Sequence, residues 1–310
     1  MEQFKPLSYV TGWVFKKDLF FIASQIDELL EDDTSHTKML QWSVGDWGHF
    51  MLDWPVVALN GAIEPSFLKL FSMSPNGNIH IATDTGSWEH VEEHIDESIE
   101  GPERRGFLRS MRMIGKNLYV TGMQRQVYQR IDEAKWQRMD QGILIPHGSD
   151  IITGFNSIDG FNEQDIYAVG FGGEIWHYNG RVWQQLDSPS NLIFSNVKCV
   201  PPETVYICGQ IGTLLRGRGN QWEIIEHEVT TGGFFGLEWF QNKLYVASSD
   251  NIFILEDDSL KPVETLKEKE LFTSGHLHSN DSILLSVGSK HLVYTDGKSW
   301  TEITCDDSSY

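Results

Sequence analysis

A short turn element that recurs along the chain restricts the possible folds more than any other feature. It consists of a Gly or Asx turn followed by a Trp, and it occurs at 83–88, 132–136, 178–183, 218–222 and 295–300. Gly and Asx tolerate the positive φ of a tight turn, and the Trp is expected to open the next strand. The chain therefore consists of repeated β-hairpin units.

Two independent markers both give seven units. The Trp residues mark units at 42, 88, 136, 183, 222 and 300, with spacings of 46, 48, 47 and 39, then 78, which is two units of 39 with Pro262 near the expected place. The central strands, marked by Phe20, Leu70, Leu118, Ile166, Val205, Leu244 and Leu284, give spacings of 50, 48, 48, 39, 39 and 40.

A period near 40 with four short strands per unit predicts an all-β fold, a seven-bladed β-propeller with four antiparallel strands per blade. Helical solenoids share this period, but central segments such as 118–122 and 244–248 are rich in β-branched and aromatic residues, which disfavour helix. We expect one domain, 1–310, in which residues 5–20 meet residues 274–305. The predicted blades are 9–43, 53–92, 105–140, 151–187, 192–228, 233–266 and 273–305.

Composition excludes several classes of protein. No run reaches the roughly 18 apolar residues of a membrane helix, and the N-terminus lacks the apolar region of a signal peptide. Three cysteines without C-x-x-C spacing argue against a disulfide framework, and Cys199 and Cys208 are expected to be reduced core residues rather than a redox pair. We expect a cytoplasmic protein.

The first three units are longer than the others, and the surplus indicates a binding face. From the outer-strand Trp to the next central strand the distance is 28, 30 and 30 residues in units one to three, but 22 in units four and five. The surplus lies in 43–54, 92–106 and 141–150, which in a propeller emerge on the same face. Long loops on a rigid scaffold often bind partners, although they can also be solvated decorations.

The content of these segments favours binding to a protein. Large apolar groups in connections, including Ile143, Leu144 and Ile145, either plug the edge of a core or anchor a partner. The acidic loop 92–100 is expected to be exposed, so that neutralising its charges would leave stability unaltered. The predicted partner-binding residues are Trp47, Phe50, Trp54, Glu92, Glu93, Asp96, Glu97, Glu100, His147 and Asp150.

The charge predicts a basic partner. With 24 basic and 44 acidic residues the formal net charge is −20, which repels nucleic acid and anionic membranes and attracts cationic proteins. The densest acidic stretches are 92–100 and 27–33, although such runs are often only solvated faces. Residues 101–146 are an exception, with nine basic and four acidic residues. Their arginines at 104, 105, 109 and 112 could form an RNA patch, but pairing with the preceding acids is the favoured interpretation.

Catalytic motifs are nearly absent, and no cofactor or metal site is predicted. His276 and His278 have the i, i+2 spacing that puts two imidazoles on one side of a strand, but no third metal ligand stands out. The Gly-rich turns lack the strand-to-helix context of a phosphate loop. The D-G-x-x-W turns are similar to the Asp-box turns of sialidase propellers, where they are structural, but a sialidase also needs arginines converging from several blades, and here they concentrate in blade three.

Residues 165–187 resemble the bacterial propeller repeats of the YVTN/BNR type, which are related in architecture to WD40 proteins but lack their G-H and W-D pairs. The resemblance implies a seven-bladed ring and no single activity, since such propellers serve as assembly factors, ligand-binding modules and protein-binding scaffolds. In size, acidity and lack of catalytic residues the chain also looks like the immunity proteins of contact-dependent growth inhibition toxins.

Two hypotheses of different classes follow. The first is a non-enzymatic immunity protein that binds and occludes a basic nuclease toxin, as a monomer or in a one-to-one heterodimer. The second is an enzyme or small-ligand propeller that uses the channel mouth, with His147, His276 and His278 as candidate residues. An assembly-factor scaffold is a further alternative. The charge and the missing catalytic motifs favour the first.

Overall fold

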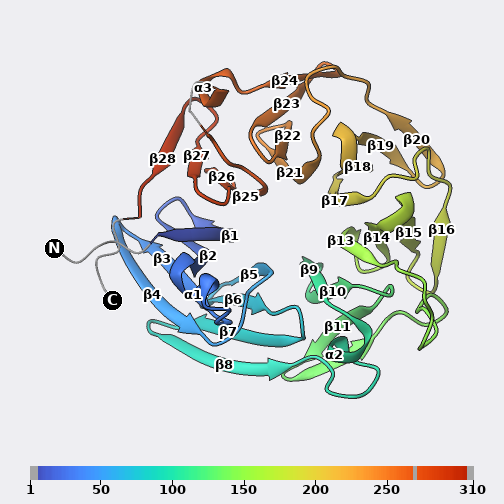
Figure 1. The fold of residues 1–310 in the computed structure, drawn as a ribbon, viewed down its shortest axis with the longest axis horizontal. Helices are drawn as coiled ribbons and strands as arrows, with labels where there is room; N and C mark the ends of the chain where they lie inside the picture. The colour runs from blue at the N-terminus through green and yellow to red at the C-terminus, as the bar shows by residue number, and fades with distance from the viewer. Residues whose placement is uncertain (1–5, 268–270, 306–310) are drawn as a thin grey trace. The chain divides into compact units, whose positions relative to one another are not determined.

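The predicted β-meanders form seven separate sheets. The computed structural model describes residues 6–267 and 271–305. Within them lie seven four-stranded antiparallel sheets, each in chain order (Figure 1). The chain is thus a seven-bladed β-propeller with four strands per blade, as predicted. It divides into two compact units, Met1–Leu59 with Glu238–Tyr310 and Asn60–Leu237, whose boundaries fall within strands β5 and β21.

The first unit holds blades one, six and seven. Blade one consists of β1 (Leu7–Lys16), β2 (Leu19–Ile26), α1 (Asp27–Glu31), β3 (Thr37–Ser43) and β4 (Asp46–Leu52). Blade six consists of β21 (Phe234–Phe240), β22 (Lys243–Ser248), β23 (Ile252–Glu256) and β24 (Ser259–Pro262), followed by α3 (Glu264–Lys267). Blade seven consists of β25 (His276–Ser279), β26 (Leu284–Val287), β27 (Leu292–Thr295) and β28 (Trp300–Ile303).

The second unit holds blades two to five. Blade two consists of β5 (Ala58–Glu64), β6 (Phe67–Met73), β7 (Asn78–Asp84) and β8 (Trp88–His94). Blade three consists of α2 (Pro102–Arg105), β9 (Leu108–Ile114), β10 (Asn117–Gly122), β11 (Val127–Asp132) and β12 (Lys135–Arg138). Blade four consists of β13 (Phe155–Asn162), β14 (Asp165–Gly170), η1 (Phe171–Gly173), β15 (Ile175–Tyr178) and β16 (Trp183–Leu186). Blade five consists of β17 (Phe194–Val200), β18 (Thr204–Gly209), η2 (Gln210–Gly212), β19 (Leu214–Arg218) and β20 (Gln221–Ile224).

The turn before the outer-strand Trp has the predicted geometry in blade four. Gly180 has a φ of 85°, and the amide of Asn179 donates a hydrogen bond to the carbonyl of Val182 at 3.3 Å. Strands β15 and β16 then pair with Tyr178 opposite Trp183. The Asn-Gly sequence thus supplies the positive φ that closes the hairpin.

Blade one differs from the prediction. Residues 43–54, expected to form a long connection, instead contain β4, which pairs with β3 so that Trp42 lies opposite Trp47. The turn residues Val44 and Gly45 both have positive φ, 50° and 92°, as in a type I′ hairpin. The prediction was wrong because Val-Gly is not a usual sequence for this turn.

Trp47 and not Trp42 is therefore the outer-strand Trp of blade one. From Trp47 to Leu70 the distance is 23 residues, close to the 22 of units four and five. The connection after blade one is consequently of ordinary length, whereas those after blades two and three are long. The Gly-x-Trp spacing at Gly45 and Trp47, which matches Gly86 and Trp88, is the signal that could have shown this.

The terminal blades meet within the first unit, as predicted. The amide of Tyr9 on β1 donates to the carbonyl of Ser289 at 2.9 Å, and Lys290 donates to Asp27 at 2.5 Å. One buried apolar cluster contains side chains of both blades: Val14, Phe20, Ile22, Leu40, Ile283, Leu285, Val287 and Leu292. Lys5, the first residue of the prediction, lies outside the described residues.

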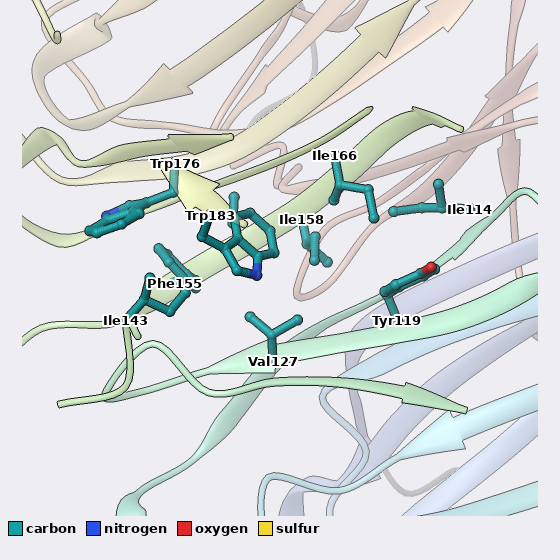
Figure 2. Packing of buried hydrophobic residues seen from close by; sticks show 10 residues of the cluster. Ile114, Tyr119, Val127, Ile143, Phe155, Ile158, Ile166, Trp176 and Trp183 are labelled. Atoms are coloured by element: carbon teal, nitrogen blue, oxygen red, sulfur yellow. The ribbon is translucent and has the colours of Figure 1, made fainter. Parts of the chain in front are cut away.

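Blades three and four pack through facing apolar side chains (Figure 2). Tyr119 and Val127 from blade three lie opposite Phe155, Ile166 and Trp183 from blade four, in one buried cluster. The period of two in these strands puts apolar residues on the faces that a neighbouring sheet covers. Trp183 is 8% exposed, and its indole N–H donates to the carbonyl of Met139 at 2.8 Å. The Trp that marks the repeat is thus part of the core.

We expect Trp183→Ala to destabilise the protein by about 3–5 kcal/mol, because it removes a large buried side chain and leaves a cavity. The neighbouring Val182 is 53% exposed, so Val182→Ala is a matched control that should change the free energy of unfolding by less than about 0.5 kcal/mol. Urea unfolding followed by circular dichroism measures both. Equal midpoints for Trp183→Ala and the unchanged protein would show that the repeated Trp does not hold the blades together.

Candidate partner-binding site

The site is built from the two long connections of the second unit. One runs from 95 to 107, between β8 and β9, and includes α2; the other runs from 139 to 154, between β12 and β13. The predicted segment 92–106 begins too early, because Glu92 and Glu93 belong to β8. Each connection reaches the turn between β10 and β11: the amide of Met123 donates to the carbonyl of Phe107 at 2.9 Å, and that of Gln124 to the carbonyl of Thr153 at 2.8 Å.

Arg105 joins these connections through a single buried guanidinium. The residue is 6% exposed, and its Nη1 donates to the carbonyl of Ile145 at 2.7 Å and to Oε1 of Gln124 at 3.1 Å. Its Nε donates to Oε2 of Glu100 at 2.7 Å, and this hydrogen bond lowers the pKa of the Glu100 carboxyl. Both connections and the intervening turn are therefore fixed to one another.

Two further arginines stabilise the same region. Arg138 donates through Nη1 to the carbonyl of Glu100 at 2.7 Å and through Nη2 to Asp140 at 2.8 Å. Arg125 forms a bidentate pair with Glu174, at 2.8 and 2.6 Å, and its guanidinium carbon lies 5.0 Å from the ring of Trp176. Much of the basic excess of residues 101–146 is thus taken up by ion pairs within the fold.

The four arginines at 104, 105, 109 and 112 have different environments. The prediction that they pair with the preceding acids is confirmed only for Arg105. Arg112 instead pairs at 3.0 Å with Asp159, which follows it in the chain, and Arg109 lies over the ring of Phe171 at 5.5 Å. Arg104 is exposed.

The acidic loop is less exposed than predicted. The side chain of Glu93 is 1% exposed, accepts a hydrogen bond from Nε of Arg130 at 2.9 Å, and accepts another from the amide of Ala134 at 2.8 Å. Burial raises the pKa of Glu93, but these hydrogen bonds outweigh burial and hold the pKa below its ordinary value. Asp96 lies 3.4 Å from Arg138, whereas Glu92 and Glu97 are exposed. The expectation that the whole loop can be neutralised without loss of stability is therefore wrong for Glu93.

The predicted aromatic residues lie in the first unit. Trp47 on β4 is half-buried, with its ring 5.1 Å from that of Trp42, and its indole N–H donates to the carbonyl of Thr304 at 3.3 Å. Phe50, also on β4, and Trp54 are half-buried. These three side chains belong to an outer strand and the residues after it, so they are not part of the two long connections.

Apolar residues of the second connection divide into two groups. Ile143 and Ile145 are each 5% exposed, and Figure 2 shows Ile143 beside Phe155 at the edge of the core between blades three and four. They plug that edge. In contrast, Ile151 and Ile152 at the end of the connection are exposed.

A hollow of about 510 Å³ opens where the two connections meet the β10–β11 turn. Its lining includes three exposed apolar side chains that the sequence analysis did not select: Phe107, Ile151 and Ile152. Asp150 also lines it, whereas His147 is exposed in the same connection. The predicted segments ended at residues 106 and 150, one residue short of each apolar group, because apolar residues beside strands were assigned to the strands.

Two of the three candidate residues of the channel hypothesis, His276 and His278, have structural roles. Nε2 of His276 lies 3.0 Å from the carbonyl oxygen of Gly12, and Nδ1 of His278 accepts a hydrogen bond from the amide of Val14 at 3.1 Å. Among the described residues, no group of three or more His, Cys, Asp or Glu is arranged to hold a metal ion. Cys199 and Cys208 are buried and unpaired, and burial raises the pKa of both thiols. In the described part of the chain no helix has the length and apolar character needed to cross a membrane.

Comparisons with known proteins give one close relative and several distant structures. The chain is 36% identical over 309 residues to the immune protein Tsi7 of Pseudomonas aeruginosa, covering 98% of this chain and 99% of that protein. Of solved structures, YCF48 bound to D1 peptide has a TM-score of 0.66 at 11% identity, covering 99% and 94% of the two chains. The C-terminal WD40 domain of Sif2 has a TM-score of 0.56 at 11% identity, covering 93% and 95%. These structures show the fold alone, and no family model matches the chain.

We expect Glu93→Gln to destabilise the protein by about 3 kcal/mol at pH 7, because it leaves the partly buried Arg130 without its countercharge. The folded-state pKa of Glu93 lies below its value of 4.5 in an unfolded chain. Its stabilising contribution is therefore present above that value and is lost as the pH falls through the folded-state pKa. Thermal melts between pH 7 and pH 3 should show the two proteins converging in acid.

The exposed neighbour Glu92 provides the control for this experiment. Glu92→Gln should shift the free energy of unfolding by less than about 0.5 kcal/mol at any of these pH values. If Glu93→Gln melted like Glu92→Gln at pH 7, the Glu93–Arg130 pair would not contribute to folding as described.

Proposed function

Since the chain belongs to the family of the immune protein Tsi7, we propose that it is an immunity protein that neutralises a toxin by binding to it directly. The alignment with Tsi7 extends over nearly the whole of both chains, and this observation carries the proposal. The seven-bladed scaffold with two long connections, joined by Arg105, supports a binding function because rigid blades present loops in a fixed arrangement.

The partner that fits best is a basic nuclease domain, bound one to one. The formal charge of −20 favours association with a cationic protein and opposes direct binding to nucleic acid. A nuclease needs a cationic surface to hold the phosphate backbone of its substrate. An acidic protein that covers this surface would compete directly with the substrate. A toxin of contact-dependent growth inhibition, neutralised in the cytoplasm, is the class of partner that we propose.

The side chains support binding rather than catalysis. His276 and His278, which the alternative hypothesis would use, hydrogen-bond to the backbone of β1. Charged side chains of the second unit, such as Arg125 and Glu174, form ion pairs with one another within the fold. We therefore propose that the chain acts without turnover. An assembly-factor function has only the likeness to YCF48 in its favour, and this likeness extends to the fold alone.

The test is whether a gene adjacent to this one encodes a basic nuclease domain that the chain neutralises. Expression of that domain alone should stop bacterial growth, and co-expression of this chain should restore it. With a catalytically inactive toxin variant, stopped-flow measurements should give association on the order of 10⁸ M⁻¹s⁻¹ at low salt, falling steeply as salt screens the charges. Continued growth arrest despite co-expression would refute the immunity function, and a salt-independent rate would refute the basic partner.

A further inference from the structure

The hollow between the two long connections has the features of a docking surface. We propose that a basic toxin domain docks there, with Phe107, Ile151 and Ile152 as its apolar contacts. This inference rests on the proposed function and deepens it, because it assigns the surface and the residues through which the toxin is bound.

These three residues are exposed to solvent within one hollow. Phe107 is 57% exposed, Ile151 58% and Ile152 79%, and all three line the same hollow. The same connections bury Ile95, Ile143 and Ile145 at 5–6% exposure, so the fold covers some apolar groups here; it leaves outside these three and also Ile99, which does not line the hollow. Adjacent large apolar side chains in solvent are typical of surfaces that another protein covers.

The backbone around the hollow is fixed before any partner binds. Gly106 directly precedes Phe107, and Gly154 lies two residues after Ile152; their φ angles are 108° and 156°. A side chain at Gly106 would lie 3.1 Å from Cβ of Met123, and one at Gly154 only 2.5 Å from Cα of Met123. Both glycines therefore let the connections approach the β10–β11 turn closely. Together with the Arg105 hydrogen bonds, this packing orders the surface in advance, which reduces the entropy cost of binding.

The four connections of the second unit lie at the same ends of their blades. Inner strands of successive blades are hydrogen-bonded to one another: Nδ2 of Asn156, near the start of β13, donates to the carbonyl of Phe194 at the start of β17 at 2.7 Å, and Nδ2 of Asn60 on β5 donates to that of Met111 in the middle of β9 at 3.3 Å. In an antiparallel four-stranded meander the last strand ends where the first begins, so every connection emerges at this end. The residues of 95–107, 139–154, 187–193 and 225–233 thus share one face of this unit.

The exposed charge of that face is mostly acidic, although Asp150 lines the hollow together with the exposed Arg109. Six exposed carboxylates lie on the four connections: Glu97, Glu103, Asp150, Asp187, Glu226 and Glu228. Arg104 is the one exposed Lys or Arg on these segments, and the buried Arg105 is paired with Glu100. At the start of β9, Arg109 adds one further guanidinium, placed over Phe171. Apolar anchors within a predominantly acidic rim fit a partner with a predominantly cationic rim around an apolar centre.

The probe is the catalytically inactive product of the adjacent nuclease gene, with affinity measured by surface plasmon resonance. The double variant Ile151→Asp/Ile152→Asp should weaken binding at least 100-fold, mainly through faster dissociation, because it puts charge into the apolar contact. Phe107→Ala should weaken binding roughly tenfold or more. Ile63 on β5 is 66% exposed at the opposite end of its strand, so Ile63→Asp is the matched control and should leave the affinity within twofold.

The melting temperatures of all variants should match that of the unchanged protein, since every substituted side chain is more than half exposed. Should the double Asp variant melt early, Phe107→Ala decides the outcome by itself. Charge is tested separately: Glu97→Gln/Glu103→Gln/Asp150→Asn should slow association several-fold and reduce its salt dependence while dissociation stays nearly unchanged.

The possible outcomes separate this proposal from the proposed function. If the unchanged protein does not bind the toxin, both are overturned. If it binds and the hollow variants bind equally well, the immunity function stands and the surface assignment is wrong. If the unchanged protein is a dimer in sedimentation experiments, and the Ile151→Asp/Ile152→Asp variant is a monomer with full toxin affinity, a second copy of this chain and not the toxin occupies the hollow, and the proposal is again overturned.

Discussion

A four-stranded antiparallel sheet with apolar residues on both faces cannot remain folded by itself, and this constraint organises the whole chain. Each face must be covered by another sheet, so the repeat has to continue from blade to blade. In the second unit this need is met where Tyr119 and Val127 face Phe155 and Trp183 (Figure 2). In the first unit the earliest and latest blades in the chain cover each other, and β1 is bonded to β25 through His276 and His278.

The features of the candidate site depend on that scaffold. Because the strands are fixed by packing, extra residues are accommodated between strands, and in the second unit two successive connections between blades are long. Hydrogen bonds from arginines of blade three fix these loops. Arg105 links both connections, and Arg125 and Arg138 hold the surrounding turns. Since these charges are satisfied internally, carboxylates make up most of the exposed charge of this face, and three of its exposed apolar side chains line one hollow.

The fold could be predicted from the sequence because its signals are local and repeated. The Gly-x-x-Trp turn needs only a few neighbouring residues to be recognised, and it occurs often enough that drifted copies do not hide the period. Two outer strands were misplaced: that of blade six, expected from Pro262 onward, is Ser259–Pro262, and β4 follows a Val44-Gly45 turn, where a β-branched residue with positive φ gives no usual signal. The Gly45-x-Trp47 element is the copy of the repeated turn in blade one. Trp42 lies so close to it in sequence that it was mistaken for the outer-strand Trp.

The site could be predicted only in part, because its contacts are distant in sequence. That an acidic loop follows blade two was evident, but the partners of its acids, such as Arg130 for Glu93 and Arg138 for Asp96, lie about 40 residues away and leave no local pattern. Alternation along β8, which turns Glu93 inward and Glu92 outward, would have indicated the difference once the strand was extended to His94. Phe107 and Ile151 were missed because an apolar residue next to a strand is indistinguishable from the strand's own first residue.

The central claim is that the connections of the second unit bind a toxin, and hydrogen–deuterium exchange of the chain alone and in complex with the inactive toxin tests it most directly. The account predicts slower exchange on binding for the amides of 95–107, 139–154 and the turn between β10 and β11. The turns at the opposite blade ends, such as that between β9 and β10, should exchange unchanged. Protection confined to those opposite turns, or to the first unit, would contradict the account.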